Sequence, residues 1–129
     1  MTTCLASESS TNEHYDMNDW RELKLMTKAL GDIARLAIVY HLARETEITV
    51  TALTAMLGLS QPLVSWHLRK LRRAGLIRTR RMGRQVYCSL DIPRYQQCLQ
   101  SLAYLIDPAI QLEELPAGEA LAAEAMGED

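Results

Sequence analysis

The chain has 129 residues, of which 48% are hydrophobic, so we expect one domain with a single small core and exclude disorder throughout. No apolar run reaches the ~18 residues that would cross a bilayer, and the first residues lack the basic start and apolar middle of a secretion signal. Three cysteines, an odd number without a repeated spacing, argue against a disulfide framework and fit a reducing compartment. We therefore expect a cytoplasmic protein without a membrane partner.

The formal net charge of -2 conceals a strong segregation of charge along the chain. Residues 1–59 carry 5 basic and 8 acidic side chains, residues 60–94 carry 9 and 1, and residues 95–129 carry none and 7. Affinity for phosphate depends on where basic side chains lie, so the local charge of +8 favours a nucleic-acid partner.

The first half of the chain predicts a flexible polar arm over residues 1–17, followed by three helices. Asn18, Asp32 and Thr49 are the expected N-caps, and Gly31 and Gly58 are the expected stops. Helical spacing gives the first helix one apolar stripe, formed by Trp20, Leu23, Met26 or Thr27 and Leu30. The second is apolar around much of its circumference, as a core helix should be, with Ile33, Leu36, Ala37, Tyr40 and Leu42, and the third has Val50, Leu53, Met56 and Leu57 facing inward.

A fourth helix is predicted to start at Ser60 with a proline in its first turn and to end at Gly75. Its apolar stripe is formed by Val64, Leu68 and Leu71. The opposite face holds Gln61, Ser65, Trp66, Arg69, Lys70 and Arg73. A short helix, a tight turn and a second helix with a basic outer face are typical of a helix-turn-helix unit.

Residues 76–81 and 85–90 alternate as two strands around a short turn, which predicts a hairpin. Four arginines crowd this hairpin, which indicates an anionic partner: Arg78, Arg80, Arg81 and Arg84. A final helix is expected from Asp91 and Pro93 to Ile106, followed by an acidic, Ala- and Glu-rich tail over residues 107–129 that is partly helical at best.

This order of elements resembles that of the ArsR/SmtB family of bacterial transcription repressors over Trp20 to Ile106. The segments that carry the resemblance are ALGDIARLAIVYHL, SQPLVSWHLRKLRRAGLI and GRQVYCSL, with Ile33 where the family commonly has proline. The resemblance implies a mainly α, winged helix-turn-helix domain over residues 18–106, with five helices, a two-stranded β-wing, and a homodimer formed by the first and last helices. The apolar faces of those helices also exceed what one small core can bury. The expected interface residues are Trp20, Leu23, Tyr95, Leu99, Leu102 and Ile106.

The function that the resemblance implies is sequence-specific repression, with a dimer bound to an inverted-repeat operator in double-stranded DNA. Gln61, Ser65 and Trp66 match the base-contacting positions. Ser60, Arg69, Lys70, Arg73, Arg81 and Arg84 are expected to contact the DNA backbone. Nothing supports an enzyme, because the sequence has no Gly-rich phosphate loop, no paired carboxylates in an apolar setting and no recognisable Ser, His and acid set.

Members of this family commonly release DNA when a metal binds or a thiol reacts. Thr49 and Thr51 stand where one family metal site has cysteines. Asp91, Pro93, Tyr104 and Asp107 stand at the second site, without the two imidazoles of a zinc cage. We therefore expect both zinc sites to be lost, and we expect structural roles for His14, His41 and His67.

The candidate sensor thiols are Cys4, Cys88 and Cys98. These thiols would bind a thiophilic metal or metalloid ion as inducer, or would themselves be oxidised. The alternative is that the cysteines only pack and that the regulator needs no effector. A second alternative is a winged-helix module that binds an acidic protein. Such a module would bind the chain's own upstream DNA no more tightly than a random duplex, so a DNA titration discriminates between the two functions.

Overall fold

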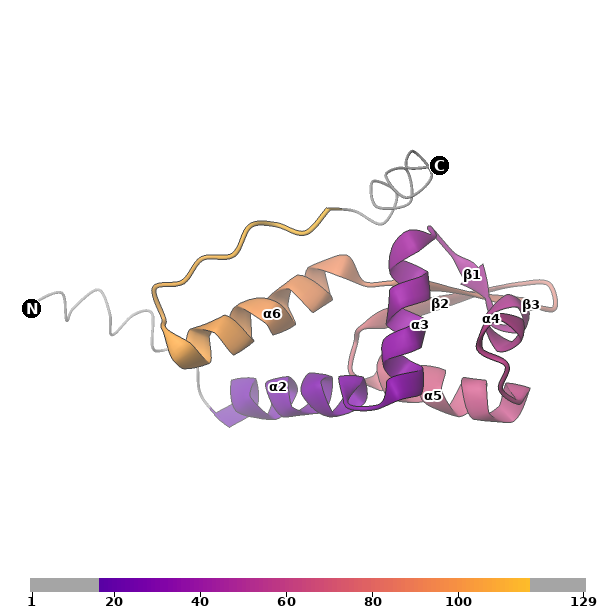
Figure 1. The fold of residues 1–129 in the computed structure, drawn as a ribbon, viewed down its shortest axis with the longest axis horizontal. Coiled ribbons are helices and arrows are strands. Elements are labelled where there is room, and N and C mark those ends of the chain that lie inside the picture. The colour runs from indigo at the N-terminus through magenta and orange to yellow at the C-terminus, as the bar shows by residue number, and fades with distance from the viewer. Residues whose placement is uncertain (1–16, 117–129) are drawn as a thin grey trace, which may run out of the picture.

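The computed structural model describes residues 17–116. This part of the chain forms five helices and three short strands (Figure 1). In chain order they are α2 (Met17–Leu30), α3 (Ile33–Arg44), β1 (Ile48–Thr49), α4 (Val50–Leu57), α5 (Gln61–Arg73), β2 (Ile77–Met82), β3 (Gln85–Leu90) and α6 (Ile92–Ile106). The predicted five helices and β-wing are confirmed, whereas nearly all of the predicted arm and residues 117–129 of the tail lie outside the described residues.

None of the helices in the described part of the chain is both long enough and apolar enough to cross a bilayer.

Four helices begin at side-chain caps. Two of these caps are residues that the sequence predicts as caps, and the other two lie at predicted helix starts. A side-chain oxygen of the cap residue accepts a hydrogen bond from a backbone N–H of the first turn in each case, which satisfies a donor that the helix itself leaves unpaired. These caps are Asp32, Thr49, Ser60 and Asp91. The predicted cap Asn18 is wrong, because α2 already begins at Met17 and Asn18 lies inside it.

The hydrophobic core is formed where α3, α4 and α5 meet the sheet, around Ile38, Leu42, Leu53, Val64 and Leu76. The core positions predicted for α3 are partly wrong: Ile33 is 85% exposed, and Leu36 and Tyr40 are about half exposed. The buried face of α3 is instead Arg35, Ile38, Val39 and Leu42. Met56, predicted to face inward from α4, is exposed as well.

The wing has a third strand that the sequence does not predict. The strand order is β1-β3-β2, and both pairings are antiparallel. Strand β1 has only two residues, with Ile48 opposite Cys88 and Thr49 opposite Tyr87. A strand of this length is too short to show the alternation of apolar and polar residues that identifies a strand in a sequence.

After α6 the chain turns back and runs alongside that helix (Figure 1). We call residues 107–116 the strap; it contains no helix. Gln100 donates to the carbonyl of Ile110 at 2.7 Å and accepts from the N–H of Leu112 at 3.0 Å. One turn earlier, Gln96 donates to the carbonyl of Glu113 at 3.1 Å and accepts from the N–H of Leu115 at 2.8 Å. Two side-chain amides thus fix the path of the strap.

Candidate nucleic-acid interface

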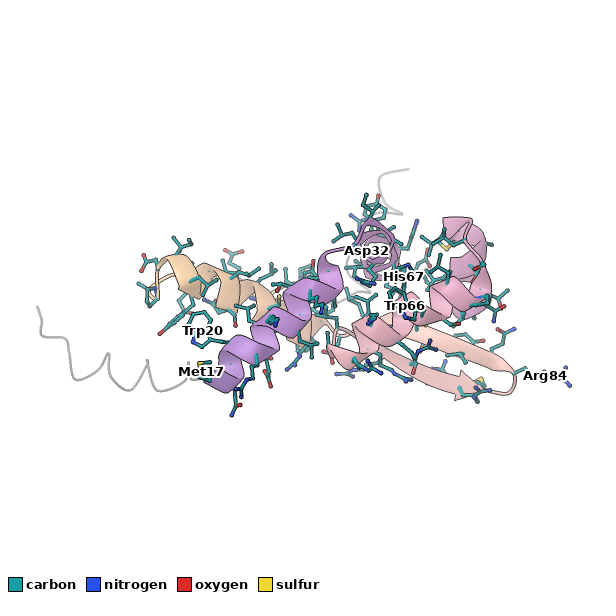
Figure 2. All side chains as sticks on the ribbon, turned by 90° about the horizontal axis from the view of Figure 1, so that it is seen from below. Met17, Trp20, Asp32, Trp66, His67 and Arg84 are labelled. Carbon is teal, nitrogen blue, oxygen red and sulfur yellow. The ribbon has the colours of Figure 1, made fainter. Side chains whose placement is uncertain are left out.

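Helix α5 is strongly two-sided. Its predicted apolar stripe is buried, with Val64 and Leu71 fully buried and Leu68 5% exposed. On the other side, Gln61, Trp66, Arg69 and Arg73 are exposed, while Ser65 and Lys70 are half-buried. Figure 2 shows Trp66 on this helix, which lies beside the β2–β3 hairpin, and Arg84 pointing outward from the hairpin tip. Helix and hairpin therefore present their basic side chains from two neighbouring elements.

A groove of about 290 Å³ lies between α5 and the wing. Its polar lining consists of Ser65, Arg69 and Arg72 from α5 and of Thr79 and Arg81 from β2. Three guanidinium groups and two hydroxyls in one hollow suit the oxygens of a phosphate, because arginine offers several donors in a fixed, planar arrangement.

Arg72 is a functional candidate that the sequence analysis missed. It lines the groove, and its Nη1 donates to Oγ1 of Thr79 in the wing at 3.4 Å. Ser65, Arg69 and Arg72 follow one another at helical spacing of four and three residues. That spacing alone would have placed Arg72 on the same face.

Two of the four wing arginines are neutralised within the chain, which corrects the expectation that all four await an external anion. Nε of Arg78 lies 3.1 Å from the Asp91 carboxylate. Arg80 donates two hydrogen bonds, of 2.7 and 2.8 Å, to Glu47 and thereby lowers the pKa of that carboxyl. Arg81 and Arg84 are exposed, and neither has an ion pair with any acid in residues 17–116.

Trp66 is held in place by two cations. The Lys70 ammonium lies 4.9 Å, and the Arg35 guanidinium 5.6 Å, from the centre of the indole ring. Such contacts favour a ring that keeps one position. With 42% of its surface exposed, Trp66 therefore presents a fixed aromatic surface on the outer side of α5.

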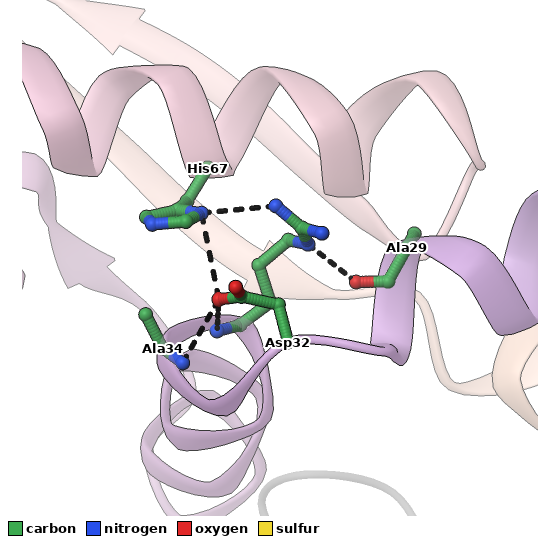
Figure 3. A network of polar contacts seen from close by, with 5 residues as sticks. Ala29, Asp32, Ala34 and His67 are labelled. Atoms are coloured by element: carbon green, nitrogen blue, oxygen red, sulfur yellow. Dashed lines mark hydrogen bonds and ion pairs between the residues drawn. The ribbon is translucent and has the colours of Figure 1, made fainter.

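A buried polar network fixes α5 against the rest of the domain (Figure 3). Arg35 is only 9% exposed; its Nε donates to the carbonyl of Ala29 at 2.6 Å, and its Nη1 lies 3.0 Å from Nδ1 of His67. Oδ2 of Asp32 lies farther from the same nitrogen, at 3.8 Å. Arginine has no acceptor, so at 3.0 Å Nδ1 must accept, and the imidazole proton is on Nε2. The end of α2, the start of α3 and the middle of α5 are thus joined.

His67 therefore has the structural role that the sequence predicts, since it is buried and hydrogen-bonded. The ring of His41 packs edge-on against Tyr40, with ring centres 5.5 Å apart. His14 lies outside the described residues.

Both described cysteines are buried, and neither is in a disulfide. Burial raises the pKa of Cys88 to about 11 and also raises the pKa of Cys98. A thiol must lose its proton to attack an oxidant or bind a metal, and burial disfavours that deprotonated form in both cysteines. Cys4 lies outside the described residues. Within residues 17–116, no three His, Cys, Asp or Glu side chains are grouped in a way that could hold a metal ion.

Helices α2 and α6 lie side by side, and an ion pair of 3.6 Å between Glu22 and Arg94 joins them (Figure 1). Of the residues predicted for a dimer interface, Ile106, Trp20 and Leu102 are exposed, by 84%, 41% and 38%. Leu23 belongs to the core of the protomer and leaves almost no surface for a partner. Leu99 is half-buried, and Tyr95 is half-buried and packs against the core.

The family model described as bacterial regulatory protein, arsR family, matches residues 32–79, which run from the cap of α3 into the wing. The arsenical resistance operon repressor of Escherichia coli is 37% identical over 89 residues, which are 67% of this chain and 71% of that protein. The chain belongs to the ArsR family.

Two further proteins are similar to the chain. The arsenic resistance transcriptional regulator ArsR1 of Pseudomonas putida is 41% identical over 73 residues, 55% of this chain and 57% of that protein. The structure of NolR from Sinorhizobium fredii is 31% identical, covers 74% of this chain and 97% of the NolR chain, and has a TM-score of 0.54. The chain spans between 53% and 60% of the length of the first curated relatives it matches.

The comparisons confirm the winged-helix fold and the family that the sequence resembles. They also confirm that the relatives are regulators of transcription and not enzymes.

Proposed function

We propose that this ArsR-family chain is a transcriptional repressor that binds an inverted-repeat operator as a homodimer. The observation that carries the proposal is the groove between α5 and the wing, where Arg69, Arg72 and Arg81 converge beside Ser65. A groove with this charge suits a DNA strand whose backbone passes between α5 and the wing.

The residues divide by the kind of contact that they would make. Gln61, the first residue of α5, and Ser65 and Trp66 would face the base edges. Ser60, Arg69, Lys70, Arg72, Arg73, Arg81 and Arg84 would contact the backbone.

The dimer would form through α2 and α6, where Leu102 and Ile106 remain exposed in the protomer. A two-fold dimer would then bind two half-sites roughly 34 Å apart, one turn of DNA, with one α5 helix at each. Light scattering should give the mass of a dimer for the parent chain and for Met56→Glu, an exposed residue on α4. For the double variant Leu102→Glu, Ile106→Glu, light scattering should give the mass of a monomer. A double variant that is still a dimer would contradict an interface through α2 and α6.

The proposal gives Cys88 and Cys98 a packing role, which their burial and raised pKa support. Arsenite, cadmium and peroxide should therefore release operator DNA equally from the parent, Cys88→Ser and Cys98→Ser. If release occurs in the parent and is lost in either variant, thiol sensing replaces the packing role.

The decisive experiment is a titration of the chain's own upstream DNA, and of a random duplex, at several salt concentrations. Replacing both Arg81 and Arg84 by alanine should reduce the slope of log affinity against log salt by roughly 1.8, because each lost phosphate contact contributes about 0.9. Arg78→Ala is the matched control, since it removes a wing arginine that Asp91 already neutralises.

An unchanged slope in the double variant would show that the wing does not contact phosphate. Equal affinity of the parent for its upstream DNA and for random duplex would contradict sequence-specific repression and favour the protein-binding alternative.

A further inference from the structure

A cleft of about 360 Å³ is bounded by α3, the start of α6 and the end of the strap. Its lining is mainly apolar and includes Leu36, Val39, Ile92, Tyr95, Leu115 and Pro116. These residues come from three segments that are distant in sequence. None of them belongs to the groove between α5 and the wing.

The strap forms one wall of this cleft. Gln96 accepts a hydrogen bond from the backbone of Leu115 at 2.8 Å, which fixes Leu115 at the edge of the hollow. Figure 1 shows the strap running along α6 toward α3. The strap is held by hydrogen bonds and contributes Leu115 and Pro116 to the lining.

A single basic side chain, Arg44, stands in the lining of the cleft. Its guanidinium lies 3.7 Å from the ring centre of Tyr40 and donates to the Tyr40 carbonyl at 3.0 Å. No acid in residues 17–116 forms an ion pair with Arg44. The cleft thus combines an apolar interior with one cation that no acid among the described residues neutralises.

We propose that this cleft is a binding site for a small amphipathic anion, a carboxylate with an apolar tail. Its volume falls within the roughly 300–1,000 Å³ of small-molecule sites. The apolar tail would contact Leu36, Val39 and Tyr95, and the carboxylate would pair with Arg44. This binding is independent of the proposed DNA binding and is measured without DNA.

Isothermal titration of the full chain with hexanoate, octanoate and 1-octanol tests the proposal. Octanoate should bind at one site per chain and about tenfold more tightly than hexanoate, because two more methylene groups are buried. Octanoate should also bind about fivefold more tightly than octanol, the gain expected from pairing with a partly exposed arginine.

Two variants locate the site, each with a matched control. Arg44→Gln should remove the preference for octanoate over octanol. Arg21 is an exposed arginine on α2, and Arg21→Gln should keep that preference. Ala43→Phe adds a ring to the lining and should abolish binding, whereas Ala55→Phe, at an exposed position on α4, should not. Thermal unfolding of each variant establishes that it is folded. No saturable binding by the parent, or binding that persists in folded Ala43→Phe, would overturn the proposal.

Discussion

The guanidinium of Arg35 donates to Nδ1 of His67 at 3.0 Å, and this bond connects the first turn of α3 to the middle of α5. Both side chains are buried, and the Nη1 of Arg35 has its contact with Nδ1 of His67 away from bulk water. His67→Leu should lower the free energy of unfolding by about 2–3 kcal/mol, because a buried cation loses a partner. Urea unfolding measures this loss.

The double variant Arg35→Met, His67→Leu is the control. It removes the buried charge together with its acceptor, so the loss should be clearly smaller than the sum of the two single losses. Additive losses would mean that the two side chains do not interact.

The same contact predicts the tautomer of His67. Nδ1 accepts from Arg35, so the ring proton should be on Nε2. Nitrogen-15 NMR of the imidazole distinguishes a protonated from an unprotonated ring nitrogen. A proton on Nδ1 would instead indicate that His67 donates to Asp32, 3.8 Å away.

Gly75 should tolerate alanine less well than Gly83. Both have positive φ, 80° and 64°, so both substitutions strain the backbone. A Cβ at Gly75 would also lie 2.9 Å from Nε of Arg94, which donates to the carbonyl of Ala74, whereas a Cβ at Gly83 would meet nothing within 4 Å. Gly75→Ala should therefore cost about 1 kcal/mol more than Gly83→Ala in chemical unfolding, the size of one hydrogen bond. Equal costs in the two variants would show that the Arg94 side chain does not limit the space at Gly75.

Cys88 should make the protein sensitive to alkali. Burial raises its pKa to about 11, so the unfolded chain loses this proton at lower pH than the folded chain. The stability that the buried, protonated Cys88 thiol contributes is fully present below the pKa of the thiol in the unfolded chain, about 8.5. About 2–3 kcal/mol of that stability should be lost as the pH rises toward 11. Unfolding at pH 8 and pH 10.5 should show a smaller pH-dependent loss for Cys88→Ala than for the parent. Identical losses would contradict the raised pKa.

Gln61 should affect base preference. Gln61→Ala should weaken operator binding by about 1–3 kcal/mol, the discrimination of one bidentate base contact, and leave random-duplex binding unchanged. Gln85→Ala, an exposed glutamine of the wing, serves as the control. Equal weakening on both DNAs would assign Gln61 to the backbone.

Local signals in the sequence predicted much of this structure. The caps Asp32 and Thr49 and the stripe Val64, Leu68 and Leu71 depend on residues within two turns, which is why spacing alone identifies them. Helix α3 shows the limit of such signals. Its apolar residues surround the helix, so periodicity did not identify the buried face.

The pairs that the sequence could not predict join residues far apart in the chain. Arg35 is separated from His67 by 32 positions and Arg80 from Glu47 by 33. From the composition alone, Arg35, Arg80 and Arg94 are known only as positive charges. In the folded chain each of them donates to a specific intramolecular acceptor, so each also has a structural role within the domain.

The strap has a consequence for how this sequence can change over generations. Gln96 and Gln100 bind only main-chain atoms of the strap, and every residue except proline offers the same N–H and carbonyl groups. Substitutions at Ile110, Leu112 or Glu113 therefore leave the path of the strap intact, whereas a change at either glutamine removes two hydrogen bonds at once. Close relatives that keep both glutamines are thus expected to keep the strap in place even where its own sequence has diverged.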